Sequence, residues 1–142
     1  MVKEMKKIEE NIFYRVYIAY LNKDYPATFV SCLYIAFVYM FLFAPIYGLC
    51  IDLFKGIGKN IIKFLYIIYV AVILIIIFKK YYNKVTLNNI LNRNKHKKQY
   101  LPTWCYFIIL PISMILGIGL YILVSIQILQ RLNLEGYLYD LL

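Results

Sequence analysis

The side chains able to carry out chemistry are few in this sequence and lie far apart. The single histidine, His96, stands within a run of lysines, where a solvated loop residue is the expected role. The three cysteines, Cys32, Cys50 and Cys105, form no C-x-x-C pair, and an odd number cannot all pair with one another. Haem or zinc would need ligands that the sequence does not supply. The sequence therefore predicts no metal site and no cofactor.

Nucleophilic catalysis and phosphate binding are also excluded by the residue pattern. Ser31, Ser113 and Ser125 fall inside long apolar runs, without a histidine and an acid to form a catalytic set. The stretch KGIGKN at 55–60 is similar to part of a phosphate-binding loop. It lacks the first glycine of that motif, and Asn60 stands where the motif needs a Ser or Thr that binds magnesium. We interpret it as a turn and predict a protein that is not an enzyme.

The composition is that of a membrane protein. Hydrophobic residues make up 63% of the 142 residues and charged residues only 16%, with a mean hydropathy of +0.69. Soluble domains have roughly half apolar and about a quarter charged residues. The net charge is +9, and the basic residues flank long uncharged runs. Anionic lipids are therefore the expected partner of these charges, and nucleic acid is not.

Three apolar runs divide the chain. They predict an all-α membrane domain over 27–127, with spans at about 29–49, 61–78 and 104–127. Twenty-one helical residues reach about 31 Å, enough to cross the hydrocarbon core of a bilayer. Pro45 in the first span and Pro111 in the third predict bends in these helices.

The segments outside the spans differ in character. Residues 1–26 carry apolar residues at helical spacing among charged ones, which predicts an N-terminal amphipathic helix. Such a helix either lies in the membrane interface or packs on the bundle or on a partner. Residues 79–100 form a basic loop without any acid, with a short amphipathic turn near 85–91. The tail at 128–142 is fairly apolar but too short to cross a membrane.

The distribution of basic residues predicts the orientation. The N-terminal segment and the basic loop together hold twelve Lys and Arg, against four on the other side. The positive-inside rule therefore places the N-terminus in the cytoplasm and the C-terminus and its tail outside it. The basic residues of the loop are a topology determinant, or they also bind anionic lipid. This candidate lipid-contact set is Lys79, Lys80, Lys84, Arg93, Lys95, Lys97 and Lys98.

Small residues form stripes on two of the spans. Stripes of this kind let helix backbones approach closely in lipid. They either pack together within the chain or contact a helix of another protein. The candidate packing or partner interface is Cys32, Ala36, Met40, Ala44, Gly48, Ser113 and Gly117. The second span has only Ala71 as a small residue, so we expect it to face lipid.

Tyrosine is abundant, with sixteen residues, several of them within the spans. A tyrosine hydroxyl buried in lipid requires a hydrogen-bond partner. Three helices alone offer few free acceptors, which favours a larger complex in which another subunit supplies them. The alternative explanation is translation from an AT-rich genome, because the sequence is rich in Ile, Lys and Asn as well as Tyr.

Runs such as NNILNRNK at 88–95 resemble those of small membrane proteins of malaria parasites. Over the whole chain, the size and three-helix plan look like the small apicomplexan subunit that binds the parasite's sodium-pumping P-type ATPase. That resemblance implies an accessory protein of the plasma membrane that stabilises or modulates a pump. The sequence Tyr100-Leu101-Pro102, leading into a helix with Pro111, is similar to small regulatory subunits of dolichol-phosphate mannose synthase, which have two spans and not three.

Three functional hypotheses follow. The first is a non-enzymatic accessory subunit of a larger membrane transport protein, with a P-type cation ATPase as the best candidate. The second is a small self-assembling protein that permeabilises membranes, of the holin or defence-effector type, although no span has the polar face that a wide aqueous pore needs. The third is a protein that binds lipid surfaces through its basic loop.

Overall fold

The computed structural model describes residues 2–53, 59–95 and 102–124, and these residues are helical except for the short connections at 21–26 and 82–83 and position 102. Three of their helices are long and apolar enough to cross a membrane, which indicates a membrane location and confirms the predicted all-α class with three helices of spanning length. The five helices are α1 (Val2–Tyr20), α2 (Ala27–Leu53), α3 (Lys59–Tyr81), α4 (Lys84–Lys95) and α5 (Thr103–Val124).

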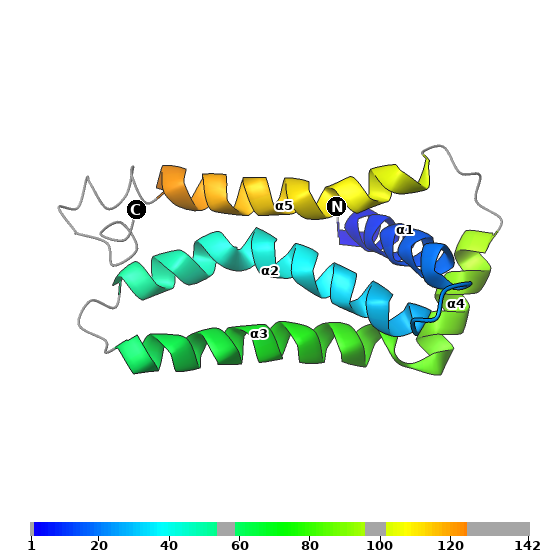
Figure 1. Ribbon diagram of the computed structural model, residues 1–142, viewed down its shortest axis with the longest axis horizontal. Helices are drawn as coiled ribbons and strands as arrows, with labels where there is room; N and C mark the ends of the chain where they lie inside the picture. Colours follow the sequence, from blue (N-terminus) through cyan, green and yellow to red (C-terminus); the bar gives the residue numbers. More distant parts are fainter. Residues whose placement is uncertain (1, 54–58, 96–101, 125–142) are drawn as a thin grey trace.

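Helix α2 is the centre of the arrangement. It lies between α5 and α3, and the three long helices run side by side along the molecule (Figure 1). Helix α1 packs on α2 and α5 close to the end where α2 begins, and α4 closes that same end. Because α2 contacts α1, α3 and α5, it is more enclosed than the other two membrane-length helices: 39% of its apolar stretch is buried, against 6% for α3 and 11% for α5.

Local sequence signals set the starts of the helices. Pro26 stands just before α2, and its carbonyl accepts the Val30 N–H at 3.1 Å. Proline is suited to a helix start because it has no N–H, and the first N–H groups of a helix have no acceptor within the helix. Asn83 caps α4: its Oδ1 accepts the Val85 N–H at 3.0 Å. Pro102 stands in the same way before α5.

The helices differ from the predicted segments at their ends. Helix α2 continues past position 49 to Leu53, and α3 extends through Tyr81. The sequence predicted that residues 84–95 belong to a loop with one short turn. In the structure they form a helix of 12 residues. Positions 125–127 of the predicted third span and the tail at 128–142 lie outside the described residues.

Helix α2 changes direction about midway along its length (Figure 1). It contains Pro45, which has no N–H to donate to the carbonyl four residues earlier. The loss of this hydrogen bond is the physical reason for a bend in an otherwise continuous helix.

The packed core lies at the end of the molecule where α1 and α4 meet the three long helices. Phe13 and Val16 of α1 are fully buried there, together with Tyr81 of α3. The rings of Phe13 and Tyr81 stack with centroids 4.4 Å apart. Ile90 of α4 and Ile35 of α2 belong to the same cluster, so the core joins all the helices at this end.

Candidate functional site

The small-residue stripe of α2 faces the inside of the molecule. Cys32, Ala36 and Gly48 are buried, and Met40 and Ala44 are half-buried. Gly48 lies against the ring of Tyr121 of α5, and a Cβ at position 48 would overlap with that ring. The stripe is therefore occupied by contacts within the chain.

The small residues of α5 face α2 in turn. Gly117 is buried against the backbone carbonyl of Phe41, so closely that a Cβ at position 117 would overlap with it. Phe41 is the residue whose carbonyl loses its helical donor to Pro45, four positions later. The glycine thus packs on the carbonyl that the proline leaves without its helical donor. Ser113, one turn earlier, is also buried, and its hydroxyl donates to the Leu110 carbonyl at 2.7 Å.

Tyrosine hydroxyls join the helices through backbone groups. The Tyr69 hydroxyl of α3 donates to the Met40 carbonyl of α2 at 2.6 Å, and the Tyr47 hydroxyl of α2 donates to the Ile62 carbonyl of α3 at 3.2 Å. The expectation that these tyrosines need acceptors from another subunit is therefore wrong for them. Helical carbonyls keep a second lone pair, which a neighbouring hydroxyl can use.

Tyr34 of α2 makes the most specific of these contacts. Its hydroxyl donates to the Tyr106 carbonyl of α5 at 2.5 Å and accepts the Leu110 N–H at 3.2 Å. In a regular helix that N–H would donate directly to that carbonyl, four residues away. The hydroxyl thus bridges the two groups just before Pro111, and an inserted side chain of this kind is a recognised cause of helix bending.

The basic segment divides into paired and exposed charges. Lys80 is bound to Glu9 of α1 with Nζ 2.7 Å from Oε2, and an Arg93 nitrogen lies 4.0 Å from Glu10 Oε2. The pair of Lys80 with Glu9 connects α1 to α3, and the pair of Arg93 with Glu10 connects α1 to α4. Lys79, Lys84 and Lys95 are exposed and remain candidates for lipid contact, while Lys97, Lys98 and His96 lie outside the described residues.

The acidic and amide side chains of α1 were not among the predicted site residues. Glu10 is buried, and the Glu9 side chain is only 12% exposed. Asn11 donates to the Tyr106 hydroxyl of α5 at 3.4 Å. A signal for these contacts exists in the sequence: neighbouring acids near the N-terminus share their side of the membrane with a loop that has only basic charges. Which acid meets which base depends on the packing.

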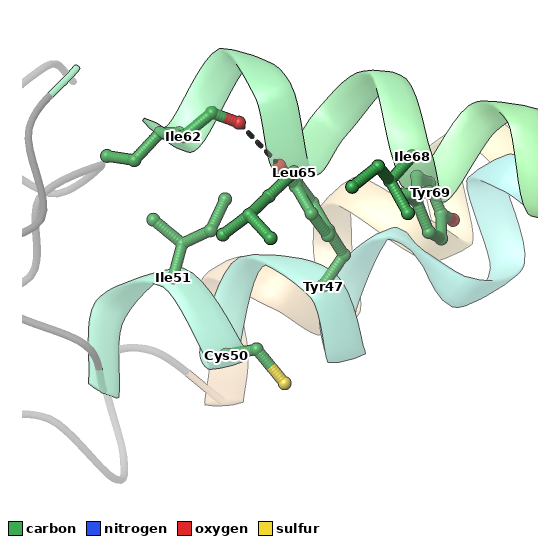
Figure 2. A pocket seen from close by; sticks show the side chains of 7 residues that line it. All are labelled: Tyr47, Cys50, Ile51, Ile62, Leu65, Ile68 and Tyr69. Atoms are coloured by element: carbon green, nitrogen blue, oxygen red, sulfur yellow. Dashed lines mark hydrogen bonds between the residues drawn. The ribbon is translucent and has the colours of Figure 1, made fainter. Parts of the chain in front are cut away.

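At the other end of the bundle, an apolar pocket of about 270 Å³ lies between α2 and α3. Figure 2 shows Ile51 of α2 pointing toward Leu65 of α3, while the Cys50 thiol points away from α3, and the hydrogen bond from Tyr47 to the Ile62 carbonyl lies at one side. None of the lining side chains is charged. The pocket offers apolar contact only.

Among the described residues, no group of His, Cys, Asp and Glu is placed to hold a metal ion. No family model matches the chain, and comparisons with curated proteins and with solved structures find no match.

Proposed function

We propose that this chain is a non-enzymatic accessory subunit that binds a larger membrane transport protein through helix α3. The observation that carries the proposal is the exposure of α3: only 6% of its apolar stretch is buried, although the helix is long enough to cross a bilayer. The face that was expected to meet lipid is therefore open to a partner helix in the membrane, which we propose takes the place of part of that lipid. Its outer face presents Phe64, Ile67 and Ile75, each more than 60% exposed. Two residues of the small-residue stripes, Gly48 and Gly117, already pack between α2 and α5, which favours internal packing for the stripes and leaves the outer faces for a partner.

The choice of partner rests on the resemblance to the apicomplexan pump subunit, which makes a P-type cation ATPase of the plasma membrane the leading candidate. In the proposed orientation, the end that carries α1 and α4 faces the cytoplasm, where the exposed Lys79, Lys84 and Lys95 meet anionic headgroups.

Helix α1 is proposed to lie at the membrane surface on that side while it packs on the bundle. Its inner face is held by the core, and its outer face includes Ile8 and Ile18, which are 61% and 44% exposed. Leu21, in the turn that follows, is 51% exposed. Exposed apolar residues on a charged helix are typical of a helix in the interface.

The test of the main proposal is purification of the tagged chain from its own cells in mild detergent, followed by mass spectrometry of the intact complex. We expect a stoichiometric complex with a much larger transport protein. A glycosylation enzyme in its place would assign the chain to the second resemblance. A homo-oligomer alone would contradict the accessory role and favour the self-assembling class, which dye release from liposomes would then examine.

Photo-crosslinking tests whether α3 is the contact helix. A photoreactive residue at Ile67 or Ile75 of α3 should crosslink to the large partner. The same residue at Ile115 of α5, which is 71% exposed, is the matched control and should not. Crosslinks from Ile115 alone would show that α5 makes the contact.

A further inference from the structure

A second groove lies where α1 meets the long helices, and its two ends differ in chemistry. It has a volume of about 240 Å³ and opens between α2 and α3. Glu9 and Lys80 line it at the end of α3, while Tyr39 and Phe43 of α2 and Ile73 and Ile76 of α3 form its apolar walls. From Lys80 to Ile73 the groove follows about 10 Å of helix into the membrane-length part of α3.

The groove is open along its apolar walls. Ile76 is 59% exposed and Phe43 is 45% exposed, although both line it. Its volume is below the roughly 300–1,000 Å³ of pockets that enclose a whole small molecule. It accommodates part of a longer molecule whose remainder stays in the bilayer.

The polar end of the groove offers both a hydrogen-bond acceptor, on Glu9, and hydrogen-bond donors, on Lys80. Glu9 Oε2 accepts from Lys80, but Glu9 Oε1 is buried and makes no hydrogen bond with any described residue. A buried carboxylate oxygen without a donor is costly. Lys80 is 34% exposed at its side chain, and its ammonium has two further N–H donors. The Tyr39 hydroxyl of α2 and the Tyr81 hydroxyl of α3 lie near the Glu9 carboxylate, and a bound headgroup would compete with them as the donor to it.

We propose that this groove binds a zwitterionic phospholipid with a primary ammonium headgroup, phosphatidylethanolamine. The headgroup ammonium donates to Glu9 Oε1, the phosphate accepts from Lys80, and one acyl chain lies along Tyr39, Phe43 and Ile76. Charge complementarity selects this lipid. A choline headgroup has no N–H to donate, and an anionic glycerol headgroup would bring no positive charge to the carboxylate.

The experiment uses the full-length chain in nanodiscs of phosphatidylethanolamine, phosphatidylcholine and phosphatidylglycerol in equal amounts, with native mass spectrometry of the lipids retained after release. We expect phosphatidylethanolamine to be retained over phosphatidylcholine by about tenfold, the ratio expected for one more hydrogen bond to a charged group. Glu9→Gln should bring the ratio to that of the bulk lipid. Glu4→Gln, at an exposed position of the same helix, should leave it unchanged.

A second pair of variants keeps the ion pair of α1 intact. Ile76→Trp fills the groove and should abolish lipid retention. Ile75→Trp, at a neighbouring exposed position that does not line the groove, should retain lipid as the parent chain does. Equal retention of the two zwitterionic lipids, a preference for phosphatidylglycerol, or equal retention in the two tryptophan variants would each overturn the proposal. None of these results depends on whether the transport partner exists.

Discussion

Gly117 and Gly119 lie two residues apart on α5, yet a side chain would meet different surroundings at the two positions. At Gly117 a Cβ would overlap with the Phe41 carbonyl, which is backbone and cannot move aside cheaply. At Gly119 nothing lies within 4 Å. We expect Gly117→Ala to destabilise the protein by about 1–3 kcal/mol through overpacking, and Gly119→Ala to stabilise it by up to about 1 kcal/mol through helix propensity. Unfolding in detergent, followed by circular dichroism, measures both. Equal stability of the two variants would contradict the close contact of α2 with α5.

The bridging hydroxyl of Tyr34 gives a second prediction at this scale. Tyr34→Phe removes both hydrogen bonds of the bridge, and the Leu110 N–H reaches the Tyr106 carbonyl again only if the helix shifts at that point, so we expect a loss of about 0.5–2 kcal/mol. Tyr66→Phe is the control, because the Tyr66 side chain is half exposed on α3 and makes no hydrogen bond to a described residue. The same unfolding measurement applies, and equal effects of the two substitutions would show that the bridge contributes nothing.

The sequence indicates which residues are small or hydroxylated, but not what they meet. The spacing of Ser113 and Gly117 marked them as packing residues, and both are buried. The contact between Gly117 and the carbonyl freed by Pro45 depends on the register of two helices, which no single-helix pattern contains. The acceptors of Tyr34 and Tyr69 were missed for the same reason, because they are backbone atoms of a different helix.

Ion pairing connects α1 to the rest of the bundle, and this contact can be tested by exchanging the charges. Lys80→Glu would set a third acid beside Glu9 and Glu10, so we expect α1 docking to weaken by about 1–3 kcal/mol. Trypsin cleavage after Lys23, in the turn between α1 and α2, should then become faster. The double exchange Glu9→Lys with Lys80→Glu should restore resistance, and Lys79→Glu at an exposed position should have little effect. Failure of the double exchange to restore resistance would mean that the pair does not hold α1.

Long apolar runs made the three membrane-length helices predictable, while α4 was expected only as a turn. Its segment contains five asparagine and threonine residues, which have low helix propensity. Tertiary contacts compensate: Ile90 and Asn94 are buried, and Leu87 packs against the core. Asn94 also donates to the Ile90 carbonyl at 2.9 Å. Apolar length therefore predicts the three membrane-length helices. Local propensity does not predict α4, because contacts with the other helices stabilise it.

At the scale of the whole molecule, the basic charges should control the orientation. Epitope tags at the two ends, combined with protease protection in sealed vesicles, should show the N-terminus protected on the cytoplasmic side and the C-terminus accessible outside. Replacement of Lys79, Lys84, Lys95, Lys97 and Lys98 with glutamine should give a mixed population. Replacement of Lys59 and Lys63 should not. A uniform orientation in the first variant would assign these lysines to lipid or partner binding and not to topology.

The position of the core at one end of the molecule has a consequence for biogenesis. Contacts there join the first and last described helices, as between Asn11 and Tyr106, which are 95 positions apart. The ribosome releases α1 first, so the inner face with Phe13 and Val16 has no complete cover until α5 has entered the membrane. Contacts so distant in sequence close late. A chain interrupted before α5 would thus present the uncovered apolar face of α1 to the machinery that removes unassembled membrane proteins.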